Sequence, residues 1–313
     1  MPRKSSPRTR IPPRLGAAFT RAAARQAQVS DSRLRGPDLS HPFHGLYAGT
    51  EPATVADRCA VLALAMSGRW AFSHSTGAIL LGAPLPQRLQ GAELPLHVAM
   101  HSERTPPRRA GVCGHRIEAG SVGVVDIGGV PVLAPEDVWC QLSTVLSRED
   151  LVAVGDYLLS GDPYDGPDRK PWCSRGQLRT AASRYSGKRG CAKVKWALER
   201  VRSGVDSRPE SLLRLVLVAA GLPEPLIADA TPVDGGRRVL HPDLKLPQWG
   251  TVFEYEGDGH RERDQWLNDV ERYSLLRAAG WEVIQVTAHD LFRDRAGFLR
   301  RVFATLGRRG YRR

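Results

Sequence analysis

The alternation of helical and strand patterns in residues 206–313 restricts the fold of this chain more than any other feature. Ser207, with Glu210 three residues later, fits a helix capping box and is followed by apolar residues at helical spacing. Two strand patterns, "RRVLHPDLKL" and "GTVFEYEG", come next, joined by a turn-like link. A helix over 263–279, a buried strand "GWEVIQVT" and a helix over 295–306 complete the order. This order predicts a mixed α+β (α/β) domain.

Acidic side chains gather on the two strands of this predicted hairpin. Asp243 lies on the first strand and Glu254 on the second, across the turn, so that their carboxylates can meet. Glu256 shares the face of Glu254, because side chains two apart on a strand point the same way. Mg²⁺ and Mn²⁺ prefer oxygen ligands, and such a cation assists phosphodiester hydrolysis. The pattern therefore predicts a Mg²⁺ (or Mn²⁺) site with Asp243 and Glu254 as ligands.

Each of these residues also has a plainer interpretation. Asp243 fits a turn residue that follows Pro242, and Glu210 fits a helix cap. His260 fits either an acid–base group that contacts phosphate or an ordinary loop histidine. Lys245, on the same face as Asp243, could supply an ammonium group to the site, although a solvated lysine is the favoured interpretation.

Four motifs of the last domain resemble those of the PD-(D/E)XK restriction-endonuclease-like superfamily. They are "HPDLKLP", "FEYEGDGH", the Asp269–Arg272 pair on the following helix, and "GWEVIQVT". More narrowly, they are similar to uncharacterised bacterial domains akin to the very-short-patch repair endonucleases. The resemblance covers the last third of the chain. It implies a metal-dependent nuclease fold in that third.

The resemblance also implies a set of catalytic residues, with one departure from the superfamily pattern. Glu256 stands where the motif usually has the lysine that orients or activates water, although related domains often carry an acid there. The general base therefore stays unassigned between His260 and water. The implied catalytic residues are Glu210, Asp243, Glu254, Glu256 and His260, of which the first three are the implied metal ligands.

Residues 1–50 carry much of the net charge of +12, with nine basic residues against two acidic ones. A basic arm on an otherwise mixed protein is typical of contact with phosphate backbones, whereas the alternative is a disordered tail that aids solubility. We expect the nucleic-acid-binding residues to be Arg3, Lys4, Arg8, Arg10, Arg33 and Arg35, with Arg263 in the last domain.

The rest of residues 1–50 outlines a winged helix-turn-helix. A helix over 17–26, a turn at 29–31, a second short helix, a break at Gly36–Pro37 and the extended piece "HPFHGLYAG" follow one another. This part of the chain is loosely similar to the winged-helix and following domain of the abortive-infection type IV antitoxin family. The resemblance implies a DNA-binding module.

The chain between these parts divides into a middle α+β domain at 51–160 and a linker with basic helices at 161–205. The linker is dense in Gly, Pro and Asp. The middle domain alternates helix and strand patterns and shows no catalytic constellation. Its histidines lack metal-ligand spacing, so we interpret them as ordinary core or surface residues: His74, His97, His101 and His115.

The sequence predicts a cytoplasmic protein with no membrane partner. Its five cysteines include no CxxC pair, its start is basic and broken by prolines, and its apolar runs fall short of the roughly 20 residues that span a bilayer. The leading functional interpretation is a metal-dependent DNA endonuclease, or nuclease-like effector, with an N-terminal DNA-binding module. The alternative is an antitoxin-like transcriptional regulator whose nuclease fold is catalytically silent. RNA is the alternative substrate, and a homodimer is a further expectation.

Overall fold

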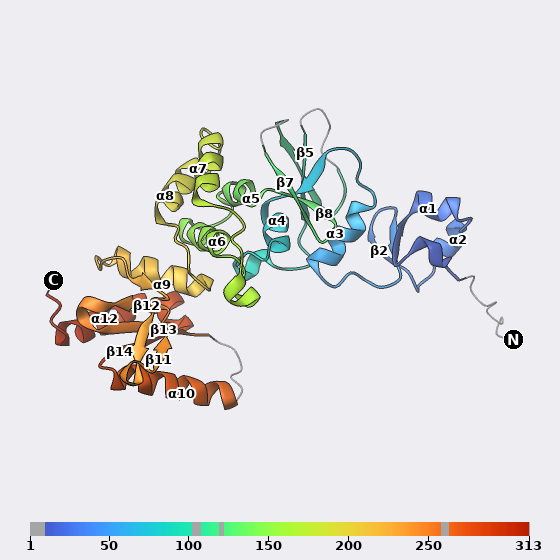
Figure 1. The fold of residues 1–313 in the computed structure, drawn as a ribbon. Coiled ribbons are helices and arrows are strands. Elements are labelled where there is room, and N and C mark those ends of the chain that lie inside the picture. Colours follow the sequence, from blue (N-terminus) through green and yellow to red (C-terminus); the bar gives the residue numbers. More distant parts are fainter. Residues whose placement is uncertain (1–9, 102–107, 119–121, 258–262, 313) are drawn as a thin grey trace. The chain divides into compact units, whose positions relative to one another are not determined.

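The computed structural model of the protein (Figure 1) describes residues 10–101, 108–118, 122–257 and 263–312. In these ranges the fold is mixed α+β with several sheets, as the sequence predicts. None of the helices in these ranges is long and apolar enough to cross a membrane.

The chain divides into two compact units. One consists of Met1–Thr144 with Thr180–Gly190, and the other of Val145–Arg179 with Cys191–Arg313. Helix α6 (Arg148–Ser160), which falls in the expected middle range, belongs to the second unit. We describe each unit by itself.

A small antiparallel sheet and two short helices form the described part of the first 50 residues. The side chains of Thr20 and Ser30 cap the two helices, each accepting a hydrogen bond from a backbone N–H three residues later. The expected helix over 17–26 is wrong in its first part, because Phe19 is buried and pairs with Tyr47 in the sheet. The elements are β1 (Ala18–Thr20), α1 (Arg21–Gln26), α2 (Asp31–Leu34), β2 (Ser40–Phe43) and β3 (Leu46–Ala48), with strand order β1-β3-β2.

A five-stranded mixed sheet forms the centre of the first unit, with strand order β6-β5-β4-β8-β7. Strands β5 and β6 are parallel, as are β4 and β8, whereas the other two pairs are antiparallel. The helix and strand patterns expected here are confirmed. The elements are α3 (Val55–Ala63), β4 (Trp70–Phe72), α4 (His74–Leu80), β5 (Leu96–His101), β6 (Val112–Ile117), β7 (Val124–Ile127), β8 (Val130–Leu133) and α5 (Pro135–Leu142).

Helices open the second unit. The two expected basic helices are confirmed as α7 (Arg175–Arg184), of which the part from Thr180 on belongs to the first unit, and α8 (Cys191–Arg200). Helix α6 was not predicted, because it is buried on several sides and so lacks the single apolar stripe that marks a surface helix. Its Asp156 forms an ion pair of 3.2 Å with Arg214, whose side chain is fully buried.

A four-stranded sheet with strand order β14-β13-β12-β9 is the main sheet of the second unit, which also contains a two-stranded sheet of β10 and β11. Its central strands β12 and β13 are antiparallel, and β13 and β14 are parallel. The elements are α9 (Arg208–Ala219), β9 (Leu226–Ile227), β10 (Thr231–Val233), β11 (Arg238–Leu240), β12 (Leu244–Leu246), β13 (Thr251–Glu256), α10 (Arg263–Ala278), β14 (Glu282–Thr287), α11 (Ala288–Phe292) and α12 (Arg295–Arg308).

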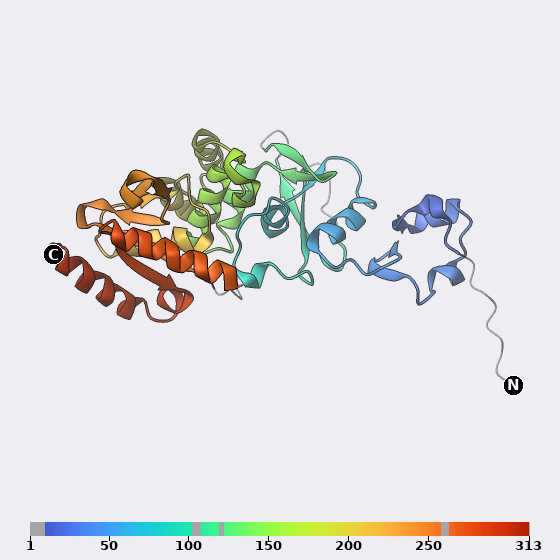
Figure 2. The same ribbon diagram turned by 60° about the horizontal axis from the view of Figure 1, so that its bottom comes forward.

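Helices cover both faces of this sheet. Phe253 of β13 packs in a buried cluster with residues of α9 and α12, whereas Val252 packs with Leu276 of α10 (Figure 2, with α10 in orange-red and α12 in dark red). The alternation along β13 therefore sends Glu254 to the same side as Val252 and α10. The expectation that Phe253 and Tyr255 face the core is confirmed.

The first strand of the expected hairpin is interrupted. Residues 238–246 form two strands in different sheets, β11 paired with β10 and β12 paired with β13. Pro242 lies at the break, where its missing N–H cannot join a ladder. Asp243 therefore precedes β12 instead of lying within a strand. Gly250 closes the link to β13 with a left-handed φ of 52°.

Candidate functional site

Three carboxyl groups of the second unit form the carboxylate cluster: Glu210, Asp243 and Glu254. Glu210 is in the first turn of α9, Asp243 directly precedes β12, and Glu254 is in β13. Because Leu244 pairs with Phe253, the register sets Asp243 beside Glu254. The two strands are also tied here by a hydrogen bond of 2.7 Å from the Tyr255 N–H to Asp243 Oδ2.

Burial disfavours the charged form of each carboxyl group in the carboxylate cluster. Burial raises the pKa of Asp243 to about 6. Burial, with the nearby charge of Asp243, raises the pKa of Glu254 to about 7 and that of Glu210 to about 8. Glu254 is only 6% exposed. The charge of Asp243 acts on both partners, so the three groups share one electrostatic environment.

Arg272 of α10 supplies part of the missing positive charge. Its Nη2 and Nε lie 2.9 Å and 3.1 Å from Glu254 Oε1, and its Nη2 also donates to the His241 carbonyl. Arg272 thus forms an ion pair with Glu254. The nearby charge of Asp269 raises the pKa of Glu254. Among the described residues no hydrogen bond takes Glu254 Oε2 or Asp243 Oδ1. Those two oxygens suit a hard cation.

Glu210 combines the two roles weighed for it. Ser207 Oγ accepts from the Glu210 N–H and caps α9, and Glu210 Oε2 accepts from the Asp206 N–H at 3.1 Å. Its carboxylate nevertheless interacts with that of Asp243, as its raised pKa indicates. The capping role therefore does not remove Glu210 from the cluster.

The remaining expected catalytic residues are placed differently. Glu256, two residues beyond Glu254 on the same face, accepts hydrogen bonds from the Tyr273 hydroxyl and from Gln285 Nε2. His260 lies outside the described residues. The two therefore stay predictions.

Lys245 is not the solvated lysine that the sequence favours. It is 6% exposed, forms an ion pair with Asp229, and donates to Thr231 Oγ1 at 3.2 Å. Its ammonium also lies over the ring of Trp281, 5.3 Å from the centroid. These partners hold the Lys245 ammonium at Asp229 and Thr231.

The expected nucleic-acid-binding residues fall into three groups. Arg10 and Arg35 are exposed. Arg33 is 11% exposed, and its guanidinium binds both carboxylate oxygens of Asp38, at 3.0 Å and 2.6 Å, so it braces the turn that follows α2. The third group lies outside the described part of the structure: the residues Arg3, Lys4 and Arg8, and the side chain of Arg263.

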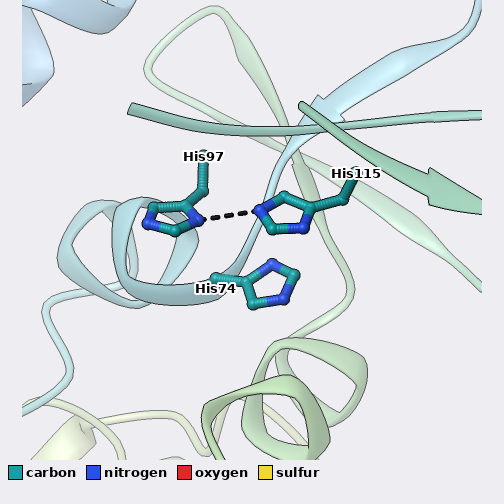
Figure 3. A group of neighbouring side chains, drawn as sticks. All are labelled: His74, His97 and His115. Carbon is teal, nitrogen blue, oxygen red and sulfur yellow. Dashed lines mark hydrogen bonds between the residues drawn. The ribbon is translucent and has the colours of Figure 1, made fainter. Parts of the chain in front are cut away.

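A second group of ionisable residues lies together in the first unit and was not predicted from the sequence: the histidine cluster of His74, His97 and His115 (Figure 3). Their ligand nitrogens all lie within 4.8 Å of one another, and among the described residues no other set of three His, Cys, Asp or Glu is so close. The sequence predicts ordinary core or surface histidines here, and the sheet brings these three together from distant segments. The side chain of His101 is outside the described ones.

Comparison with known proteins extends over both units. No protein-family model matches the chain. Two uncharacterised proteins of Mycobacterium tuberculosis, from two strains, are each 24% identical to it over 283 residues. These residues make up 90% of this chain and 97% of each relative. The chain is thus similar to these relatives along nearly its whole length.

Proposed function

We propose that the last domain is a metal-dependent endodeoxyribonuclease of the PD-(D/E)XK type. The observation that supports this most is the electrostatic coupling of the carboxylate cluster. Burial raises all three pKa values, and the charge of Asp243 adds to the shift of Glu210 and of Glu254. Like charges buried together with too little counter-charge are typical of sites that bind a cation or carry out acid–base chemistry.

Asp243 and Glu254 would hold Mg²⁺ or Mn²⁺, with Glu210 completing the acidic site. When bound, the cation supplies electrostatic stabilisation of the phosphate charge and lowers the pKa of water. The Tyr255 N–H orients the Asp243 carboxylate, and Arg272 orients that of Glu254.

Glu256 is the proposed proton acceptor on the same strand. The Tyr273 hydroxyl and Gln285 both donate to its carboxylate and so fix its direction. His260 is the proposed second proton-handling group. Both assignments replace the lysine that the superfamily usually has at the position of Glu256.

The proposed substrate is DNA, bound chiefly through its backbone. Arg10 and Arg35 are exposed and can hold phosphates without reading sequence. Helix α2 has only four residues, which is short for a recognition helix in a major groove. Binding would therefore be strongly salt-dependent. We place the protein in the cytoplasm, with RNA as the alternative substrate and a homodimer as a possible assembly.

A transcriptional regulator with a silent nuclease fold is the second candidate. Two observations favour it. Arg272 already neutralises Glu254, and the one lysine on β12 is committed to Asp229. In a protein without hydrolytic activity, these ion pairs could stabilise the buried carboxylates in place of a metal.

Incubation of the full chain with supercoiled plasmid separates the two candidates. The reactions contain Mg²⁺, Mn²⁺ or EDTA, and the proteins are the wild type, Asp243→Asn, and the control Glu271→Gln, which removes an exposed charge on α10. A nuclease nicks plasmid only with a cation, and Asp243→Asn loses the nicking. A regulator leaves the plasmid intact and binds one operator sequence equally well in EDTA.

A further inference from the structure

The histidine cluster is assembled by the sheet of the first unit. His97 in β5 and His115 in β6 lie on neighbouring parallel strands, where His97 pairs with Cys113 and Ala99 with His115. Paired residues share a face, and so do residues two apart, so both imidazoles emerge on one face of the sheet. His74 opens α4, directly after β4, the strand on the other side of β5.

The backbone around His74 and His97 is fixed by side chains of the unit. The His97 N–H donates to Thr76 Oγ1 at 2.8 Å, which ties β5 to α4. The His74 N–H donates to Gln141 Oε1 of α5 at 3.0 Å. His74 has a φ of 51°, in the left-handed region that residues other than glycine seldom adopt. Such conformations persist where surrounding structure imposes them, and they gather at functional sites.

The nitrogens of the cluster are close enough to share one ion. His97 Nδ1 and His115 Nε2 are 2.8 Å apart, and the ring of His74 lies alongside that of His115 with centroids 3.8 Å apart (Figure 3). Two imidazole ligands of a tetrahedral zinc ion have nitrogens about 3.3 Å apart, since each bond is about 2.0 Å. An opening of about 0.5 Å, together with rotation of the nearly parallel rings so that their in-plane nitrogens converge, would convert the His97–His115 hydrogen bond into a pair of ligands.

The protonation state of the cluster also suits a metal. Burial and the neighbouring imidazoles lower the pKa of His74 to about 3 and that of His97 to about 4, and burial lowers that of His115. Neutral imidazole is the form that binds metals. The ring that donates in the His97–His115 hydrogen bond would move its proton to its other nitrogen when a metal takes the shared position, so the change is one of tautomer and no proton is lost. Ser73 Oγ lies 3.1 Å from His74 Nδ1 and can fix its tautomer.

A cavity borders the cluster. Its volume is about 580 Å³, and its lining includes His74 and His115, three basic side chains and the acidic side chains of Glu118 and Asp137. Arg184 in this lining is paired with Asp137 at 2.8 Å, while Arg116 and Lys188 add further positive charge. Basic side chains thus outnumber acidic ones in the lining by three to two, which favours an anion next to the neutral imidazoles.

We propose that His74, His97 and His115 bind a divalent transition-metal ion of the zinc class, with a fourth coordination position open to this basic cavity. Three nitrogen ligands select Zn²⁺, Co²⁺ or Ni²⁺ over Mg²⁺, which requires oxygen. Three protein ligands with one open position are the arrangement of catalytic zinc sites, whereas structural sites have four. The fourth ligand is water or an anionic group such as a phosphate or carboxylate.

Titration of the metal-stripped full chain with Zn²⁺ by calorimetry, and with Co²⁺ by visible absorption, tests this proposal. We expect one Zn²⁺ with a Kd of about 1 µM or tighter, and Co²⁺ bands of four-coordinate type. His97→Gln and His115→Gln should each weaken binding by at least about 100-fold. The control His44→Gln changes an exposed histidine of the β2–β3 turn and should bind like the wild type. Asp243→Asn should do the same, which separates this site from the carboxylate cluster.

The contrary outcomes are equally definite. Absence of Co²⁺ bands in the wild type would leave the three rings as a neutral stack that only holds the sheet, and this result does not depend on any variant folding. Binding that survives in both His97→Gln and His115→Gln, with circular dichroism like the wild type, would place the ion elsewhere. For the open position, inorganic phosphate should shift the Co²⁺ bands, and Lys188→Ala should weaken that shift. Bands that phosphate leaves unchanged would mean that the fourth position is closed.

Discussion

The two ionisable clusters of this protein differ in the charge of their side chains before any metal binds. The carboxylate cluster gathers groups of like charge, so burial and repulsion raise their pKa values and a hard cation would relieve the strain. The histidine cluster gathers groups that are neutral when buried, so it is stable without a metal and suits a borderline cation. The two clusters also differ in spacing, since among the described residues only the histidine ligand atoms all lie within 4.8 Å of one another. The charge of the metal-free side chains decides which ion each cluster would bind. It also decides how strongly the stability of the cluster depends on that ion.

The largest expected effect is a loss of plasmid nicking when the carboxylate cluster is changed. Asp243→Asn should lower Mg²⁺-dependent plasmid nicking by at least about 100-fold, because the cation contributes several kcal/mol to the transition state. Glu271→Gln should retain wild-type nicking rates. If Asp243→Asn nicks as fast as the wild type, the carboxylates have no part in hydrolysis.

Removal of the guanidinium at the carboxylate cluster should have a smaller effect. Arg272→Ala leaves Glu254 without its ion-pair partner and should lower the free energy of unfolding by about 1–3 kcal/mol in EDTA. Mg²⁺ should restore part of this loss, because the cation takes over the role of the guanidinium. Urea unfolding with and without Mg²⁺ measures the effect. A loss that Mg²⁺ leaves unchanged would favour the silent fold, in which Arg272 replaces the metal.

The pH dependence of stability should have opposite signs in the two clusters. The carboxyl pKa values rise from 3.8 or 4.5 to about 6, 7 and 8 in the folded state, so their stabilisation is full below pH 4 and is lost as the pH rises towards 8. The pKa values of His74 and His97 fall from 6.5 to about 3 and 4, so their stabilisation is full above pH 6.5 and is lost as the pH falls through those values.

Urea unfolding of metal-free protein across the pH range measures these two limbs. Each titrating proton changes stability by at most about 1.4 kcal/mol per pH unit. Asp243→Asn should flatten the limb at rising pH, and His74→Gln the limb at falling pH. If both variants flattened the same limb of the stability–pH curve, the proposed difference in charge between the two clusters would be wrong.

The smallest expected effect concerns the support of the histidine cluster. Gln141→Leu removes the acceptor of the His74 N–H and should cost about 1 kcal/mol of stability. Zn²⁺ affinity should fall by about 10-fold, as outer-shell changes do. Mg²⁺-dependent nicking should be untouched. Calorimetry with Zn²⁺ checks this, and an affinity equal to that of the wild type would mean that His74 needs no such support.

Local periodicity made the carboxylate cluster predictable. Asp243 and Glu254 lie on segments joined by a short link, so the two-residue repeat of a strand and one turn fix their meeting. The break at Pro242 and the capture of Lys245 by Asp229 were not predicted, because both depend on β9–β11, which the sequence pattern did not resolve. The helix over 17–26 failed for a similar reason, since pairing with β3 overrides the helix propensity of Ala18.

The histidine cluster could not be predicted from spacing. His74, His97 and His115 lie on separate elements, and they meet only because the strand order is β6-β5-β4. A metal motif is readable from sequence when its ligands share a helix or a tight loop. Here the register of β5 with β6 decides the contact, and a shift of one residue would turn His115 to the other face.

Pro242 has one more consequence for the strand opposite. If the ladder of β12 and β13 continued, Pro242 would lie across from Tyr255, but the Tyr255 N–H is taken by the side chain of Asp243 instead. Asp243 Oδ2 thus replaces a peptide carbonyl as the acceptor at the end of the β12–β13 ladder. The backbone carbonyl of Asp243 accepts a hydrogen bond from the Ala228 N–H. Selection for folding alone would retain an aspartate or asparagine here, whether or not the protein has the proposed hydrolytic activity.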